Sequence, residues 1–504
     1  MTGRETTPFW KTERKLNTYP SLSHDHETDV CIIGGGIAGL TAAYLLSQEN
    51  KRVVVLEDGS IGSGQTVRTT GHLTNILDDR YYQLESRFGK KTTRLLAESH
   101  RKAIDLIESL VKQHSIDCDF EYLKAYLFAG QNQSPDILEK ELKAAHNAGI
   151  RDVVTVKKPP IEGFDTGMSL CFPHQAQFSP LPYLEKLCEL IQAHEGVICC
   201  KTHAEDVTPK KNGFHISTSQ KHTVVARHVI YAGHAFTGSR FLPHMKQAPY
   251  RTYVIAGEIP KGSVVKALYY DTQDPYHYVR TCPIDGRKDL LIVGGEDHRT
   301  AEQEDILASY EKLESWAMQR FPMLKKVHHH WSGQILEPLD RVAFIGRLKQ
   351  GEERYFITGD SGNGLTYGTL GAILICDLIM GRSNAWEKIY DPHRKTLKSA
   401  GTFIQENCNT FWQYRDWLKT GEVKSEKEIQ RNSGAILCEG LKKIACYRDS
   451  EGNPHKVSAV CPHLGAIVRW NESEHCWECP AHGSRFNTDG QVIEGPTNHN
   501  LEKK

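Results

Sequence analysis

Residues 28–40 read TDVCIIGGGIAGL, an apolar run followed by a G-x-G-x-x-G motif. The run Val30–Ile33 predicts a buried strand, and the apolar residues after Leu40 predict a helix. In such a unit Gly34 allows the tight turn, Gly36 lets the backbone approach a pyrophosphate, and Gly39 lets helix and strand pack closely. The phosphates are then expected at the helix N-terminus, where free N–H groups and the helix dipole favour anions.

A second strand and an acidic residue follow this motif at the expected distance. Arg52–Leu56 predicts the strand, and Glu57 comes 23 residues after Gly34. A carboxylate about 20 residues after the motif typically binds the ribose hydroxyls of a dinucleotide. An ordinary glycine-rich turn in an α/β domain is the alternative, and the added strand and acid make it the weaker one.

Length and charge bound the class of function. A chain of 504 residues predicts two or three domains. Lys+Arg and Asp+Glu number 62 each, so the chain has no net charge that would favour binding to nucleic acid or to an anionic membrane. A small-molecule function is therefore expected.

The sequence contains no apolar run of 18 residues and no signal-peptide core, which predicts a soluble cytoplasmic protein without an integral membrane segment. The 14 cysteines are expected to be mostly reduced thiols.

The middle of the chain alternates between strand-like and helical patterns. Residues 79–115 predict two helices, and 197–230 predict a strand and a β-meander that returns to the first sheet. Cys199 and Cys200 are expected on opposite faces of a strand, in the core. Residues 245–335 predict an inserted, substrate-facing sheet with one helix, Glu302–Phe321. The run His328–His330 cannot converge on one metal ion from a strand.

A further glycine loop lies between residues 355 and 380. Tyr355–Thr358 predicts a strand, GDSGNG a tight loop, and Leu365–Met380 an apolar helix that ends before Gly381. The N-terminus of this helix is expected to face the same crevice as the first helix.

Together, three separated pieces resemble the FAD-dependent oxidoreductases of the D-amino-acid oxidase type. They are GGGIAG with Glu57, GSGQTVRTTGH, and TGDSGNGLTYG. The resemblance implies that Gly62–His72 lie under the isoalloxazine ring and that Gly362–Thr366 face the flavin O2/N1 edge, where a positive helix end stabilises reduced flavin. Val67 and Thr70 stand where the family usually has glycines, and Tyr231-Ala232-Gly233 replaces the usual Ala-Thr-Gly.

This resemblance gives the expected FAD-binding residues. They are Gly34, Gly36, Ile37, Ala38, Gly39, Glu57, Gly64, Thr66, Arg68, Gly71, His72, Val207, Gly359, Gly362, Asn363, Gly364, Leu365 and Thr366. The resemblance also places His72, Tyr278, Arg341 and Tyr367 near the flavin. It does not select a catalytic residue among them, nor does it say whether FAD is covalently attached.

Near the C-terminus, two short motifs bring together thiols and imidazoles. They are Cys461-x-His463 and Cys479-x-x-His482, within CPHLG and CPAHGSRF. They resemble the Rieske [2Fe–2S] domain, in which two cysteines hold one iron and two histidines the other. A zinc site of two cysteines and two histidines is the alternative, and Cys476-x-x-Cys479 is compatible with it. A zinc site does not require the surrounding loop sequence, which favours the cluster.

Two departures from the Rieske pattern concern the loops. Ala466 and Ala481 replace the cysteines that tie the two loops together in many Rieske proteins, so no disulfide can form there. Phe486 replaces a tyrosine that donates a hydrogen bond to a ligand sulfur in high-potential members, whereas Ser484 keeps its hydroxyl.

The predicted architecture follows from these pieces. Residues 1–400 form an α/β FAD-dependent oxidoreductase domain, Rossmann-like, with an inserted mixed-sheet substrate domain. A helix and linker and a small all-β Rieske domain complete the chain. The nucleotide-binding parts span about 28–75, 195–240 and 340–385, the substrate-facing part 245–335, the linker 401–427 and the Rieske domain 428–504.

The pairing of these domains implies a converter between two-electron and one-electron chemistry. The leading hypothesis is an enzyme that oxidises the C–N bond of an amine or amino acid and passes electrons from FAD to the cluster and on to a soluble carrier. The alternative is an electron-transfer or redox-sensing protein that turns over no metabolite.

Overall fold

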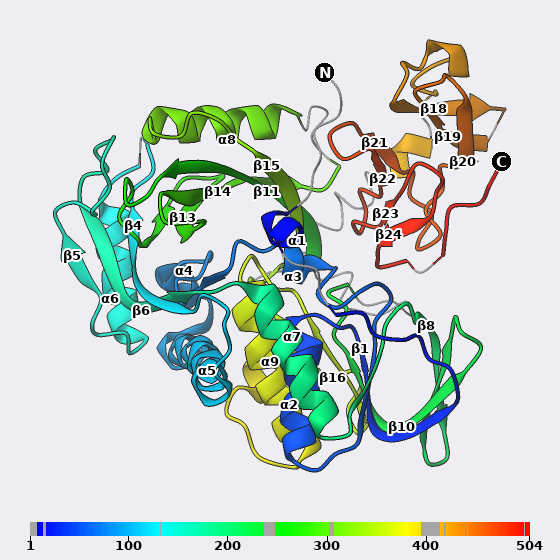
Figure 1. The fold of residues 1–504 in the computed structure, drawn as a ribbon, viewed down its shortest axis with the longest axis horizontal. Helices are drawn as coiled ribbons and strands as arrows, with labels where there is room; N and C mark the ends of the chain where they lie inside the picture. The colour runs from blue at the N-terminus through cyan, green and yellow to red at the C-terminus, as the bar shows by residue number, and fades with distance from the viewer. Residues whose placement is uncertain are drawn as a thin grey trace.

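The computed structural model describes residues 8–13, 17–131, 133–235, 247–301, 307–394, 414–417, 420–440, 442–497 and 499–504. A largely parallel sheet occupies one half of the first domain (Figure 1), with the strand order β16-β17-β10-β1-β2-β7. The central strand β1 pairs in parallel with β10 and β2, as expected for a doubly wound unit. The bounds are β1 (His26–Ile33), β2 (Val53–Leu56), β7 (Val197–Cys199), β10 (Thr223–Tyr231), β16 (Phe344–Arg347) and β17 (Arg354–Thr358).

Three helices lie side by side against this sheet and bury its apolar face (Figure 1). They are α2 (Ile37–Gln48), α7 (Pro180–Ala193) and α9 (Gly364–Ile379). The predicted meander is formed by β8 (Ala204–Lys210) and β9 (Gly213–Thr218), which continue into β10. Cys199 and Cys200 are both buried and pack in separate apolar clusters, as their predicted opposite orientations require.

A second, nine-stranded sheet with the order β15-β11-β14-β13-β12-β4-β6-β3 contains the predicted insertion. It is wider than predicted because strands from residues 72–177 pair with it through β12 and β4. The bounds are β3 (His72–Leu73), β4 (Glu121–Phe128), β5 (Val154–Val156), β6 (Ser169–Gln177), β11 (Gln247–Pro260), β12 (Leu268–Asp271), β13 (His277–Pro283), β14 (Lys288–Arg299) and β15 (His329–Pro338).

The remaining helices surround these sheets. The two helices predicted within 79–115 are α4 (Tyr81–Phe88) and α5 (Lys90–His114). The helix predicted at 302–321 is α8 (Leu307–Arg320), and its expected first residues, 302–306, lie outside the described residues. Short helices are α1 (Phe9–Glu13), α3 (Gln65–Arg68), α6 (Asp136–Asn147) and α10 (Glu387–Tyr390).

The C-terminal domain consists of two small antiparallel sheets around a core that includes the buried side chain of Trp477. One sheet contains β18 (Ser433–Glu439), β19 (Lys442–Arg448) and β20 (Pro454–Ser458); the other contains β21 (Arg469–Asn471), β22 (Cys476–Glu478), β23 (Arg485–Phe486) and β24 (Val492–Glu494). Of the predicted 401–427 helix and linker, residues 401–413 and 418–419 lie outside the described residues. The described part begins with a 3₁₀ turn, Tyr414–Trp417, and a second turn spans Glu426–Glu428.

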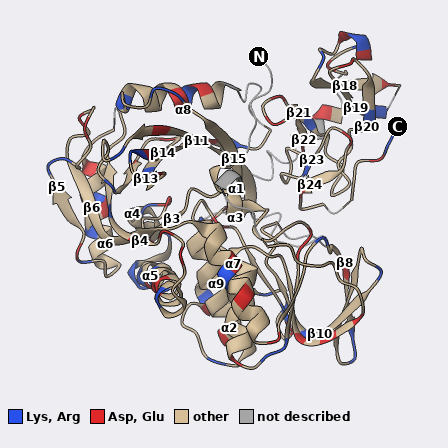
Figure 2. Cartoon of the chain, in the orientation of Figure 1, with Lys and Arg blue, Asp and Glu red and all other residues tan. Residues whose placement is uncertain are grey.

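Acidic and basic residues are interspersed along the chain (Figure 2), and red and blue segments alternate along α8. This agrees with the equal numbers of acidic and basic residues. Within the described ranges, every helix is too short or too polar to cross a bilayer.

Candidate functional site

The first glycine turn has the geometry that its motif requires. Gly34 has a φ of +116°, and a Cβ there would lie 2.7 Å from the Ala232 backbone. A Cβ on Gly39 would lie 2.0 Å from the Gly34 carbonyl oxygen, so only glycine lets α2 pack this closely on β1. A Cβ on Gly36 would lie 3.0 Å from the Thr66 hydroxyl oxygen and narrow the crevice at the start of α2.

Glu57 lies beside this turn at the end of β2. One carboxylate oxygen accepts a hydrogen bond from the Gly35 N–H at 2.6 Å, and the other accepts one from the Gly59 N–H at 2.9 Å. Burial raises the pKa of Glu57, and the two N–H donors oppose that rise. Each oxygen keeps a lone pair for a further donor such as a ribose hydroxyl.

A cavity of about 550 Å³ extends from this turn across the ends of the strands toward the second sheet. Fourteen of the predicted FAD-binding residues line it: Gly34, Gly36, Ile37, Ala38, Glu57, Gly64, Thr66, Arg68, His72, Gly359, Gly362, Asn363, Gly364 and Leu365. Gly39, Gly71, Val207 and Thr366 are not among its walls. Val207 lies in the β8–β9 hairpin, and Thr202, His203 and Ala204 line the cavity near Glu57 instead.

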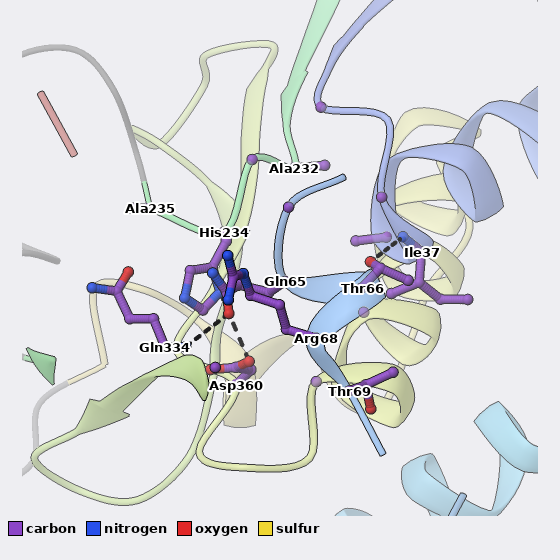
Figure 3. Close-up of a pocket in the computed structure, with 18 of the residues that line it drawn as sticks. Ile37, Gln65, Thr66, Arg68, Thr69, Ala232, His234, Ala235, Gln334 and Asp360 are labelled. Carbon is purple, nitrogen blue, oxygen red and sulfur yellow. Dashed lines mark hydrogen bonds and ion pairs between the residues drawn. The ribbon is translucent and has the colours of Figure 1, made fainter. Parts of the chain in front are cut away.

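The second predicted flavin loop forms the short helix α3 at the cavity wall. The Thr66 hydroxyl accepts a hydrogen bond from the Ile37 N–H at 3.1 Å, so this loop is attached to the first turn of α2 (Figure 3). The side-chain oxygen of Gln65, from the same loop, accepts a hydrogen bond from the backbone N–H of Gln334 at 2.7 Å. These features fit an FAD molecule: glycine loops precede two helices, an acid stands where the ribose would bind, and the cavity lies between two sheets.

At the start of α9 the cavity contains a buried acid that the sequence analysis did not identify. Gly362 has a φ of +78°, and a Cβ there would lie 1.9 Å from an Asp78 carboxylate oxygen. The Tyr276 hydroxyl donates to the same oxygen at 2.9 Å. Burial raises the pKa of Asp78 to about 7, although Arg80 and Tyr276 act in the opposite direction. Asp78 sits in a loop six residues after His72 and outside the matched motifs, so nothing in the sequence pattern marks it.

Aromatic side chains surround this acid in a chamber made by the second sheet. His72 lies 5.6 Å, ring to ring, from both Tyr270 and Tyr278, and the Tyr278 hydroxyl is 3.0 Å from that of Thr252. Burial and the nearby Arg280 lower the pKa of His72 to about 3, so His72 is neutral at physiological pH.

Of the four residues that the resemblance placed near the flavin, three line the cavity and one does not. His72, Tyr278 and Tyr367 line the cavity. Arg341 does not; its guanidinium pairs with Glu337 at 2.8 Å and with Asp79 at 3.6 Å.

The four predicted cluster ligands meet in the C-terminal domain. Cys461 and Cys479 are buried, and the His463 and His482 rings lie 4.9 Å apart at 83°. The facing Cys479 thiol, the His463 and Leu464 N–H groups and the Ser484 hydroxyl lower the pKa of Cys461, which favours the thiolate. Two sulfurs and two imidazoles from two loops match the donor set that a [2Fe–2S] cluster requires.

The side chains around the cluster site are largely buried. Ser484 is buried with its hydroxyl directed at Cys461, and Phe486 is fully buried in the domain core. His463 is half-buried and His482 is buried, because the loop that carries His482 packs against Gln334 of the first domain.

We expect Glu57→Ala to weaken FAD binding by about 1.5–3 kcal/mol, because a hydrogen bond that involves a charged group is lost. Titration of the apoprotein with FAD measures this change. Glu27→Ala, which removes an exposed carboxylate from β1, is the matched control. Equal FAD retention in Glu57→Ala and its parent would count against the assignment.

The reduction potential of the cluster is expected near the lower end of the Rieske range of about −150 to +300 mV. Hydrogen bonds to cluster sulfurs raise the potential, and Phe486 offers none where a tyrosine would. Redox titration followed by circular dichroism measures it. A value above roughly +200 mV on that scale contradicts the inference.

Known proteins show the same two parts. A family model described as FAD dependent oxidoreductase matches residues 29–378, and one described as Rieske [2Fe-2S] domain matches residues 417–503. A putative Rieske 2Fe-2S iron-sulfur protein, YhfW, of Bacillus subtilis (strain 168) is 32% identical over 97% of this chain and 95% of its own length.

More distant similarities cover the first domain. Gamma-glutamylputrescine oxidoreductase of Escherichia coli (strain K12) is 26% identical over 78% of this chain and 93% of its own length. The crystal structure of glycine oxidase from Geobacillus kaustophilus shares the fold, with a TM-score of 0.61 and 17% identity over 73% of this chain and 99% of that one.

Proposed function

The chain belongs to the FAD-dependent oxidoreductase family and carries a C-terminal Rieske domain, and from this we propose that it is a dehydrogenase acting on C–N bonds. Its cofactors are FAD and a [2Fe–2S] cluster. We assign FAD to the cavity between the two sheets, and the cluster to Cys461, Cys479, His463 and His482. When bound, FAD accepts a hydride and the cluster takes up electrons one at a time, for delivery to an external carrier.

The substrate is proposed to be an amine or amino acid that binds in the chamber of His72, Tyr270, Tyr276 and Tyr278 beside Asp78. A carboxylate in an aromatic chamber attracts a protonated amine. Two relatives support this class by name, a gamma-glutamylputrescine oxidoreductase and a glycine oxidase. The observation that carries the proposal is the position of Asp78, which lies in the cavity wall beside the glycine loop that precedes α9.

Asp78 is assigned as the base that takes the ammonium proton, because only the neutral amine has the nitrogen lone pair that assists loss of hydride from carbon. The proton moves from the substrate nitrogen to an Asp78 carboxylate oxygen. The Tyr276 hydroxyl fixes the carboxylate by donating to it. Neutral His72 adds no positive charge that would repel the cationic substrate.

A substrate panel under anaerobic conditions tests the proposed function. Amines and amino acids are mixed with the holoenzyme, and loss of the yellow flavin absorbance is followed. The proposal expects at least one of these compounds to reduce the flavin within the time of a catalytic turnover. If the flavin responds only to redox mediators across a broad panel, the redox-sensing alternative replaces it.

We expect Asp78→Asn to slow flavin reduction by about 10²-fold, within the range for loss of a general base. The base must be ionised, and the pKa of Asp78 is raised to about 7, so the rate in the parent should rise with pH through about 7. Stopped-flow measurement from pH 6 to 9 should show this rise in the parent and its absence in Asp78→Asn. An unchanged pH profile would show that Asp78 is not the base.

A further inference from the structure

The last strand of the Rieske domain reaches the cavity of the first domain. Val492, Ile493, Glu494 and Gly495 all contribute to the cavity wall. Ile493 is 50% exposed and is one of the residues that line the cavity. The Rieske domain therefore presents an apolar side chain to the space assigned to FAD.

Hydrogen bonds connect this strand and the His482 loop to the cavity. The side-chain NH₂ group of Gln65 donates a hydrogen bond to the Glu494 carboxylate. The side-chain oxygen of Gln65 accepts a hydrogen bond from the backbone N–H of Gln334 at 2.7 Å. The Gln334 amide donates to the Gly483 carbonyl oxygen at 2.9 Å, directly after the cluster ligand His482. A Cβ on Gly483 would lie 2.1 Å from the Gln334 amide nitrogen and 2.8 Å from Pro249, so the domains touch without a gap here.

A buried network of charges forms a further part of this interface. Arg251 of the first domain, with a side chain only 1% exposed, lies 3.3 Å from Glu478 and 3.8 Å from Glu494 of the Rieske domain. Its guanidinium also donates to the Ser332 hydroxyl at 2.7 Å, and that hydroxyl donates to Glu474. Arg251 is therefore linked across the interface, directly or through Ser332, to three carboxylates of the Rieske domain.

We propose that the Rieske domain is a fixed wall of the FAD site, with Ile493 packed against the bound cofactor and the Arg251 network holding the domain in place. This rests on the proposed position of FAD in the cavity. FAD binding and docking of the Rieske domain then stabilise each other, because coupling between two binding equilibria is reciprocal.

The first test compares Ile493→Ala with Ile284→Ala in the full chain loaded with iron. Ile284 is likewise a partly exposed isoleucine, in the turn between β13 and β14 and outside the cavity. The protein, which carries its iron but no FAD, is titrated with FAD, and the dissociation constant of FAD is measured from flavin fluorescence. Ile493→Ala should raise it about fivefold to tenfold, as expected for lost apolar contact, and Ile284→Ala should leave it at the parental value.

The second test uses the unmodified chain and needs no activity. Hydrogen–deuterium exchange is measured with and without FAD, and FAD should slow exchange in the segment 492–495. Equal affinity in Ile493→Ala and Ile284→Ala, or unchanged exchange at 492–495, overturns the proposal. If Glu57→Ala weakens FAD binding while Ile493→Ala does not, only the wall is wrong. If neither variant changes it, the position of FAD in the cavity is wrong as well.

Discussion

Replacing His482 with Ala is expected to remove the [2Fe–2S] cluster and to leave FAD bound. On the proposed assignment His482 is one of four cluster ligands, so its loss would open one iron to water. The FAD cavity is formed mainly by the first domain, which has its own apolar core. Steady-state turnover with a one-electron carrier should therefore fall to background, while anaerobic flavin reduction by substrate continues near the parental rate.

The control for this variant is His499→Ala, which removes an exposed histidine of the same domain. Iron content, flavin content and both rates are measured side by side, and the control should match the parent in all four. If His482→Ala keeps its FAD but its flavin is no longer reduced by substrate, the cluster takes part in the substrate step and the proposed order of events is wrong.

Arg485→Met is expected to destabilise the Rieske domain by about 3–5 kcal/mol, the usual consequence of removing one partner from a buried ionic network. The Arg485 side chain is 2% exposed and lies 3.1 Å from Glu478 and 3.4 Å from Glu494, and it also pairs with Glu474. Denaturant unfolding followed by the visible circular dichroism of the cluster measures the loss. Arg382→Met removes a guanidinium that is 45% exposed, and this control should cost under about 1 kcal/mol.

The same network predicts the acid response of the domain. Burial alone would raise the pKa of Glu474, but Arg485, Arg251 and Arg68 lower it to about 2 from an ordinary value of 4.5. A carboxylate with a lowered pKa stabilises the fold above its ordinary pKa, and that contribution is lost as the pH falls from about 4.5 toward 2. The destabilisation caused by Arg485→Met should shrink over this window, because protonation of Glu474 removes the charge that Arg485 neutralises.

The features that were predictable from the sequence are those that a local backbone or ligand requirement dictates. Gly34 and Gly36 hold positions where a Cβ would clash with Ala232 or narrow the crevice beside Thr66. In a Rieske domain each loop supplies one cysteine and one histidine, which must lie a few residues apart to reach the same cluster. This short spacing makes the two motifs recognisable in the sequence.

Features that depend on contacts between distant segments were not predictable in this way. The pairing of β4 with β12 joins residues 121–128 to 268–271, and no local periodicity specifies that partner. Asp78 has the sequence surroundings of an ordinary loop aspartate, and its raised pKa comes from burial by other segments. Val207 illustrates the converse, since a family position was transferred to a residue of β8 that does not line the cavity, whereas Ala204 at the start of the same strand does.

On the proposed function, electrons from the substrate pass through the flavin to the cluster within one chain. Freeze-quench electron paramagnetic resonance of the anaerobic holoenzyme, mixed with a compound that reduces the flavin, tests this order of electron transfer. The signal of the reduced cluster should appear after the flavin begins to bleach, with no external carrier present. A flavin that is fully reduced while the cluster stays oxidised, although its potential lies above that of the flavin, would contradict the account.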